Sequence, residues 1–290
     1  MGNFVIHQNV REDAELREGF FDLARQVFGL DFDSWYQAGW WTDRYLPHLL
    51  TVDGQAAANV SVNLIDTQRC GAPRRYIQLG TVMTAPAFRG RGLGRRVMEA
   101  VLDQWRDRCD GMYLYANDGA LDFYPKFGFR PAQEYLHIRP LEGGRDGTEA
   151  LDVGAPAGLA LLRSHYAMGN PFSALPMADN FGLLMFYCGS FLKGCVWFVP
   201  EQDAVVIAER RGNELLCHDI FCPPGRDLEA ILLAAAGPET ERAALGFTPL
   251  DTSRWAVQPL CEEDTTLFVL EGKEDPFAAA PCRMPSLSHA

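Results

Sequence analysis

Apolar and polar positions in the stretch 76–105 change from a strand-like to a helix-like pattern. Residues 76–84 are mostly apolar, and Pro86, which cannot donate a backbone hydrogen bond, marks the end of the predicted strand. Further along, apolar residues recur at steps of four: Leu93, Val97, Val101 and Trp105. This spacing predicts a helix with one apolar face. We expect the rest of the chain to be arranged around this strand, loop and helix.

The first half of the chain contains further predicted elements on both sides of this stretch. Apolar runs and turn signals predict strands at 4–8, 48–52, 56–66, 112–116 and 127–138. Helical spacing predicts a helix at 12–28, and we expect a short helix at 118–126. Between two of the strands, Asp53-Gly54 is a hairpin signal.

The second half follows a similar order after residues 141–150, which are rich in glycine and charge. We predict helices at 157–168, 181–192 and 227–236, and strands at 196–199, 205–209, 215–221 and 265–270. We therefore predict two domains, 1–140 and 151–290, joined by a linker at 141–150. The second is either a degenerate repeat of the first or an unrelated α+β cap, and it ends in an irregular tail at 275–290.

Composition limits the class of protein. The chain has 290 residues, of which 48% are hydrophobic and 22% charged, as in a globular protein with room for two domains. A net charge of −12 argues against a nucleic-acid surface and is compatible with a cationic substrate. Neither a signal peptide nor a membrane-spanning run is visible, so we expect a cytoplasmic protein without a membrane partner. The eight cysteines form no CxxC pair, so we expect no metal.

The loop before the predicted helix suits an anion. It consists of Arg89, Gly90, Arg91, Gly92, Leu93, Gly94 and Arg95. The first turn of a helix carries unpaired N–H groups and partial positive charge, and glycines let the backbone approach a phosphate closely. The loop is not a P-loop, and its glycine spacing does not fit the dinucleotide fingerprint. A tight turn with an exposed basic rim is the alternative interpretation.

Two motifs, taken together, resemble those of the GNAT acetyltransferase superfamily. Arg89, Gly92 and Gly94 match the pattern Arg/Gln-x-x-Gly-x-Gly/Ala. A second segment at family spacing matches the pattern Asn-x-x-Ala-x-x-x-Tyr-x-x-x-Gly-Phe at Asn117, Ala120, Tyr124, Gly128 and Phe129. The two motifs occur in the family's order and cover about the first half of the chain.

This resemblance implies a fold, a reaction and a set of site residues. The fold would be the α+β GNAT fold with a mixed sheet, present as two GNAT-like domains in tandem. The reaction would move an acetyl group from acetyl-CoA to a primary amine without a metal. The implied cofactor-binding residues are Val82, Met83, Thr84, Arg89, Gly90, Arg91, Gly92, Leu93, Gly94, Arg95 and Asn117. A neighbouring strand would splay away from residues 82–84, and an N–H near Val82 would meet the oxyanion.

Tyr124 occupies the position of the family's general acid. A tyrosine hydroxyl has an ordinary pKa of about 10, so it is protonated at neutral pH and can donate to a leaving thiolate. The alternative is a core tyrosine within a run of aromatic residues. If Tyr124 is not catalytic, the chain could be a non-catalytic acyl-CoA-binding or regulatory protein.

The acceptor side is less well defined. Residues 30–47 combine six aromatic residues with three aspartates, and Trp40, Trp41 and Asp43 are the candidate substrate contacts. The alternative is a helix that packs its aromatic side chains into the core. The central strands offer no carboxylate as a general base. The candidates are Asp31, Asp33, Asp43, His48, a water molecule or the C-terminus at Ala290. The acceptor could be a small molecule or a peptide, and a homodimer is left open.

Overall fold

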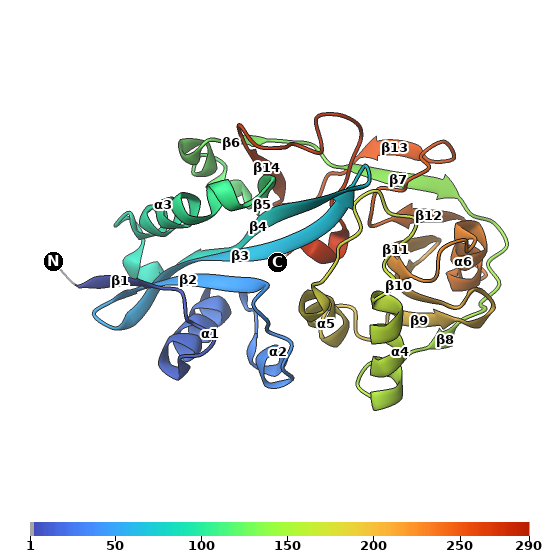
Figure 1. Ribbon diagram of the computed structural model, residues 1–290, viewed down its shortest axis with the longest axis horizontal. Coiled ribbons are helices and arrows are strands. Elements are labelled where there is room, and N and C mark those ends of the chain that lie inside the picture. Colours follow the sequence, from blue (N-terminus) through green and yellow to red (C-terminus); the bar gives the residue numbers. More distant parts are fainter. Residues whose placement is uncertain (1–2, 290) are drawn as a thin grey trace.

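The computed structural model describes residues 3–289, which form two seven-stranded mixed sheets with helices against their faces (Figure 1). The first sheet has the order β1-β2-β3-β4-β5-β14-β6 and the second β13-β7-β12-β11-β10-β9-β8. The strands of the first sheet are β1 (Phe4–His7), β2 (Tyr45–Val52), β3 (Gln55–Arg69), β4 (Ala72–Thr84), β5 (Gly111–Ala116), β6 (Phe129–Pro131) and β14 (Thr266–Leu270). Those of the second are β7 (Tyr135–Pro140), β8 (Glu149–Ala150), β9 (Val196–Val199), β10 (Ala204–Arg211), β11 (Glu214–Phe221), β12 (Arg242–Leu245) and β13 (Ala256–Pro259).

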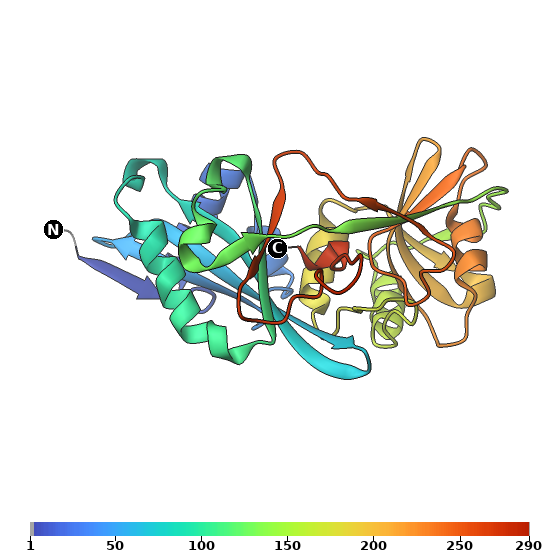
Figure 2. The same cartoon turned by 90° about the horizontal axis from the view of Figure 1, so that it is seen from above.

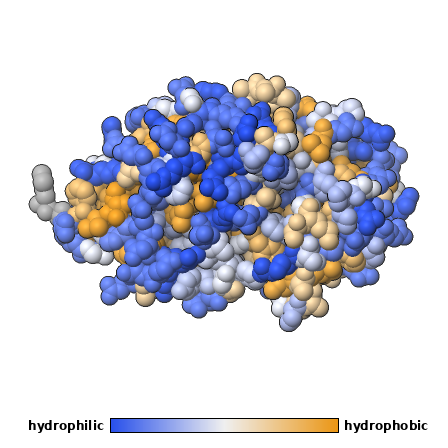
Figure 3. Space-filling model, viewed as in Figure 1, coloured by the Kyte–Doolittle hydropathy of each residue, from blue (hydrophilic) through white to orange (hydrophobic). Residues whose placement is uncertain are grey.

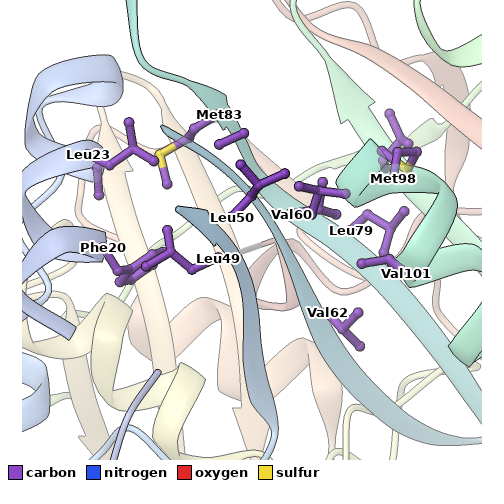
Figure 4. Packing of buried hydrophobic residues seen from close by; sticks show 14 of the residues in the cluster. Phe20, Leu23, Leu49, Leu50, Val60, Val62, Leu79, Met83, Met98 and Val101 are labelled. Carbon is purple, nitrogen blue, oxygen red and sulfur yellow. The ribbon is translucent and has the colours of Figure 1, made fainter. Parts of the chain in front are cut away.

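The α-helices are α1 (Ala14–Phe28), α2 (Asp33–Gln37), α3 (Leu93–Trp105), α4 (Pro156–Tyr166), α5 (Phe181–Gly189) and α6 (Leu228–Ala235). Helices α1 and α3 lie on opposite faces of the first sheet (Figure 1). Figure 4 shows their apolar side chains, such as Phe20 of α1 and Val101 of α3, packed against the strands between them. With both faces covered, even the polar side chains of Asn59 and Asn63 on β3 are buried.

Local signals predicted several elements well. Asp53 and Gly54 both have positive φ, as the predicted two-residue hairpin between β2 and β3 requires. The strand and helix predicted in 76–105 are present as β4 and α3. The helix predicted over 118–126 was wrong. Two 3₁₀ turns, Asp118–Ala120 and Tyr124–Phe127, take its place, and Pro125 has no N–H to continue an α-helix.

Strand exchange between the two sheets is the feature that the sequence did not predict. Residues 127–138 were predicted as one strand, but they contain β6 in the first sheet and β7 in the second. Strand β14, predicted as the last strand of the second half, lies between β5 and β6 of the first sheet. Figure 2 shows the two crossing segments, green and red. The domain limits at 140 and 150 stay a prediction, and the sheets do not divide at those residues.

The C-terminal tail, residues 271–289, returns to the space between the two sheets. Its Met284 and Leu287 belong to a buried cluster that includes Tyr113 of the first sheet and Ile207 of the second. The predicted irregular course is confirmed for the described residues, apart from a 3₁₀ turn at Ser286–Ser288. The tail is therefore part of the core that joins the two sheets.

Large apolar side chains are exposed at the edge of the first sheet that β1 forms. Phe4 and Val5 of the edge strand β1 are 46% and 44% exposed, and Figure 3 shows hydrophobic atoms gathered at this end of the molecule. The guanidinium of Arg96 on α3 lies 4.6 Å from the centre of the Phe4 ring.

Candidate functional site

The loop between β4 and α3 leaves a helix N-terminus open. Gly92, the residue before α3, has φ +73° and provides no side chain to cap the helix. Gly90 has φ +75°, a conformation that residues with a Cβ rarely adopt. The unpaired N–H groups and the positive end of the α3 dipole are therefore available to an anion.

Gly94, the last glycine of the motif, is needed because there is little room for a side chain at this position. A Cβ atom at this residue would lie 3.1 Å from Oγ1 of Thr84 on β4. The absence of a side chain thus lets the first turn of α3 lie close to the end of the strand. This close approach places the helix N-terminus next to the backbone of residues 82–84.

The four arginines around the loop take different positions. Arg89 donates from Nε to the carbonyl of Thr84 at 3.3 Å, and Arg95 pairs with Glu99 at 2.7 Å. Both line the cavity described below. Arg91 instead lies over the Phe88 ring, and Arg96 over Phe4.

Strand β4 contains a bulge directly before the predicted cofactor strand segment. Ser61 pairs with Gly80 and Asn59 with Met83, so Thr81 and Val82 both oppose Val60. Thr81 has φ +40°, which is unfavourable for a β-branched residue.

Buried hydrogen bonds hold this unfavourable conformation. The Tyr45 hydroxyl lies 2.7 Å from Thr81 Oγ1, which in turn donates to Ser61 Oγ at 2.6 Å, and Asn59 Nδ2 donates to the Thr81 carbonyl at 3.0 Å. The bulge is therefore fixed in place at the point where the cleft begins.

Just before the bulge, β4 loses its partner on one side. The parallel pairing of β4 with β5 runs from Tyr76↔Gly111 to Leu79↔Leu114 and then ends, although both strands continue. The splaying that the sequence resemblance predicted is thus confirmed. The backbone of β4 past Leu79 faces the gap and needs hydrogen-bond partners there.

Two adjoining cavities fill the gap between the splayed strands. The larger, of about 640 Å³, lies against the α3 N-terminus, and the smaller, of about 240 Å³, lies on the other side of Val82. Both are lined by Phe28, Val82, Asn117 and Tyr124. We call the two together the first cleft, with a loop side and a far side. The far side is lined by Phe28, Leu30, Gln78, Leu79, Gly80, Thr81, Val82, Tyr115, Ala116, Asn117, Tyr124, Asp264, Thr265 and His289.

Tyr124 lies at the junction of the two sides. Its side chain is 4% exposed and packs against the rings of Phe123, Phe129 and Phe268. Its hydroxyl has no hydrogen-bond partner among the described residues. Burial raises the pKa of Tyr124 to about 12, so the hydroxyl keeps its proton at neutral pH.

Most of the predicted cofactor residues meet in the first cleft. Its loop side is lined by Val82, Met83, Thr84, Arg89, Gly90, Gly92, Leu93, Gly94, Arg95 and Asn117, whereas Arg91 is not among the described lining residues. Asn117 is held by a residue of the far side, because its Nδ2 donates to Asp264 Oδ2 at 2.9 Å.

A family model described as the acetyltransferase (GNAT) family matches residues 15–129, which contain the loop, the splayed strands and Tyr124. These residues belong to the GNAT family. The suggested resemblance is therefore confirmed, and the chain carries a GNAT acyltransferase domain. No curated protein sequence matches the chain. That the second half is a degenerate GNAT repeat stays a prediction.

The similarity to solved structures extends over almost the whole chain. A conserved protein of unknown function from Enterococcus faecalis V583, described as a probable N-acyltransferase, is 12% identical, with TM-score 0.60, over 92% of this chain and 72% of that one. The GCN5-related N-acetyltransferase from Kribbella flavida is 13% identical, with TM-score 0.53, over 92% and 71%. Eis1 from Mycobacterium abscessus is 17% identical, with TM-score 0.53, over 92% and 73%. At these identities the similarity shows the fold alone, and it confirms the predicted fold class.

The predicted acceptor residues lie away from the cavities that form the first cleft. Among the described lining residues of either cavity, none is Trp40, Trp41 or Asp43. Trp41 is 4% exposed, within a cluster of aromatic side chains that includes Phe20 and Tyr45. Trp35 of the same segment donates from Nε1 to the carbonyl of Gly182 on α5 at 2.7 Å. Trp35 and Trp41 thus pack into the core, and Trp35 also contacts α5, which favours the alternative interpretation of this segment.

The base candidates named from the sequence also lie elsewhere. Asp31, Asp33, Asp43 and His48 are absent from the described lining of the first cleft, and Ala290 lies outside the described residues. Sequence reasoning missed Tyr115, Asp264 and His289, which all line the far side. No local pattern indicated Asp264 and His289, because they reach the cleft from distant segments.

The described residues hold neither a membrane-spanning helix nor a cluster of potential metal ligands. Across residues 3–289, no helix combines the length and the apolar character that crossing a bilayer requires. Within the same range, no group of three or more His, Cys, Asp or Glu side chains is arranged to hold a metal ion.

Proposed function

We propose that this GNAT-family protein transfers an acetyl group from acetyl-CoA to a primary amine. The observation that supports this most directly is the continuity of the first cleft. One cavity joins the open N-terminus of α3, the free edge of β4 and Tyr124. A cofactor with a phosphate at one end and a reactive thioester at the other fits this order of features.

Each part of acetyl-CoA would have a matching partner. The pyrophosphate would accept hydrogen bonds from the backbone N–H groups of residues 90–95, with Arg89 and Arg95 adjacent. The pantetheine amides would pair with the backbone of residues 82–84, as an added strand pairs with a sheet edge. Asn117 would contact the cofactor from β5's side of the cleft.

The transfer step would occur beside Tyr124. The acceptor first releases the extra proton of its ammonium form to water. The neutral amine nitrogen then attacks the thioester carbonyl carbon, and the electron pair of the C=O bond moves to oxygen. A backbone N–H near Val82, fixed by the bulge, would stabilise this oxyanion. When the C–S bond breaks, Tyr124 donates its proton to the sulfur.

The lining of the far side fits a cationic acceptor. Its described residues include Asp264 and the aromatic residues Tyr115 and Tyr124, but neither Lys nor Arg. An ammonium group would therefore meet no like charge on these residues as it enters. We propose a small-molecule or peptide amine as the acceptor.

Thermal unfolding with and without acetyl-CoA or CoA tests the cofactor site. A ligand at 100 times its Kd stabilises the fold by about 2.7 kcal/mol, which we expect to raise the unfolding midpoint by about 5 °C. Gly92→Glu should lose this shift, because it adds a negative charge at the α3 N-terminus.

Gly212→Glu is a matched control. Gly212 also has positive φ, is exposed and has no atom within 4 Å of the place where a Cβ would lie, but it belongs to the turn between β10 and β11. Both variants should unfold at a similar temperature without ligand, and Gly212→Glu should keep the shift. If saturating ligand leaves the wild-type midpoint unchanged, the proposed function is wrong.

A further inference from the structure

Four titratable side chains line the far side of the first cleft: Tyr115, Tyr124, Asp264 and His289. Two of them are already engaged. Asp264 accepts hydrogen bonds from Asn117 Nδ2 at 2.9 Å and from the Asp118 N–H at 2.6 Å. The Tyr115 hydroxyl donates to Glu134 Oε2 at 3.1 Å.

His289 differs from these residues because both of its ring nitrogens are available. Neither nitrogen has a hydrogen-bond partner among the described residues. The ring lies against the ring of Tyr115, with centroids 4.1 Å apart. An imidazole with free nitrogens therefore lines the same cavity as the proposed general acid, Tyr124.

The structure fixes His289 firmly for a residue so near a chain end, where order is usually poor. Asn63 Nδ2 donates to the carbonyl of Ser288 at 3.3 Å, and the Tyr113 hydroxyl lies 3.1 Å from Ser288 Oγ. The Tyr187 hydroxyl donates to the carbonyl of His289 itself. Side chains from β3, β5 and α5 thus hold the end of the tail at the cleft.

Building on the proposed acetyl transfer, we propose that His289 accepts the proton that the acceptor amine loses. When the C–N bond forms, the nitrogen becomes positively charged and one of its protons passes to a ring nitrogen of His289. The C–S bond then breaks, and the thiolate takes the proton of Tyr124. His289 returns its proton to solvent and Tyr124 regains one, so an amide and a thiol are the net products.

The surroundings of His289 keep its imidazole in the neutral form. Its ring meets Tyr115 of β5, its carbonyl meets Tyr187 of α5, and Asp264 and Tyr124 share its cavity. The side chain is exposed, so its proton can exchange with solvent, while partial desolvation by these groups and then the positive charge of Arg283 lower the pKa of His289. The imidazole is therefore neutral at neutral pH, the form that can accept a proton.

The test compares His289→Ala with His289→Phe, using a thiol-release assay with an amine that the wild type acetylates. We expect kcat/KM to fall about 100-fold in both, the lower end of the usual contribution of general base catalysis. Added imidazole should restore activity to His289→Ala, in proportion to its neutral fraction. It should not restore His289→Phe, in which a ring without nitrogen fills the space against Tyr115.

The acetyl-CoA-induced shift in unfolding midpoint should be unchanged in both variants, which shows that the fold and the cofactor site are intact. Wild-type kcat/KM in His289→Ala would overturn the inference. So would a loss in His289→Ala that imidazole does not restore, because the proton would then be accepted by another group. A wild-type protein that acetylates no amine would instead count against the proposed function itself.

Discussion

The two sheets share a topology, but their parallel strand pairs end differently. In each sheet a helix connects two parallel strands that pair over four residues, from Tyr76↔Gly111 to Leu79↔Leu114 and from Glu214↔Arg242 to Cys217↔Leu245. After β4 and β5 the strands separate around the first cleft. The corresponding position, beyond the last pair of β11 and β12, is closed by the C-terminal tail, and we call it the second junction.

Contacts of Ser286 close the second junction. Its N–H donates to the carbonyl of Gly246 at 2.7 Å, and its Oγ lies 2.9 Å from His218 Nδ1. A Cβ on Gly246 would overlap Ser286 Oγ and come within 2.8 Å of the Cα of His218. The same tail therefore closes one sheet's junction and lines the cleft of the other sheet with His289.

The helix N-termini differ as well. Gly92 leaves the first N–H groups of α3 open, whereas Asp227 caps α6 by accepting from the N–H groups of Glu229 at 2.9 Å and Ala230 at 3.4 Å. The carboxylate both satisfies these donors and repels an anion. A strand-helix-strand unit is thus not sufficient for a phosphate site, because the capping residue decides whether the donors are free.

The largest expected effect is on catalysis in the first cleft. Tyr124→Phe should lower kcat by about 100- to 10,000-fold, the usual contribution of general acid catalysis, because the thiolate would leave without a proton donor. Binding of acetyl-CoA should persist, since the ring remains. Transfer rates and acetyl-CoA-dependent unfolding midpoints measure the two effects.

Tyr36→Phe provides the control for this substitution. Tyr36 is an aromatic residue of α2 outside the described lining of the first cleft. It should keep the wild-type rate. An undiminished rate in Tyr124→Phe would show that transfer in the first cleft does not use this hydroxyl as the general acid.

The second expected effect concerns Glu134, which connects the first cleft to the tail. It accepts from the Tyr115 hydroxyl and from the Met284 N–H at 2.8 Å, and burial raises its pKa from 4.5 to about 7. Because the folded state holds this proton more tightly than the unfolded state, Glu134 contributes stability below pH 4.5 that is lost as the pH rises to 7.

Glu134→Gln removes this titration. Between pH 5 and 8, the free energy of unfolding of the variant should rise relative to wild type by roughly 2 to 3 kcal/mol. Urea unfolding at several pH values measures the difference. If the free energies of unfolding of the two proteins change with pH in parallel, the pKa of Glu134 is not raised in the folded state.

The smallest expected effect tests the helix caps. Asp227→Ala should lower the free energy of unfolding by about 1 kcal/mol and the midpoint by about 2 to 4 °C. Asp13→Ala should do the same in the first half, because Asp13 caps α1 through the N–H groups of Glu15 and Leu16. Thermal unfolding measures both.

Acetyl-CoA should shift the midpoint of Asp227→Ala and Asp13→Ala by the same amount as that of the wild type. A larger shift in Asp227→Ala alone would indicate that opening the α6 N-terminus creates a second anion site. That result would show that the capping residue alone decides which of the two helix N-termini can bind an anion.

The sequence by itself determined the features that depend on neighbouring residues. The Asp53-Gly54 hairpin, the apolar face of α3 and the glycines before it are local, and their backbone conformations follow from side-chain size and spacing. The spacing from Asn117 to Tyr124 likewise placed both residues in one cleft.

Only the tertiary structure decided which distant segments meet. The exchange of β7 and β14, the packing of residues 30–47 against α5 and the approach of His289 to Tyr124 have no local signature. Each depends on hydrogen bonding and apolar burial between parts of the chain far apart in sequence, which periodicity does not encode. The loop side of the first cleft could therefore be predicted from one stretch of sequence, whereas its far side is defined by the folded chain.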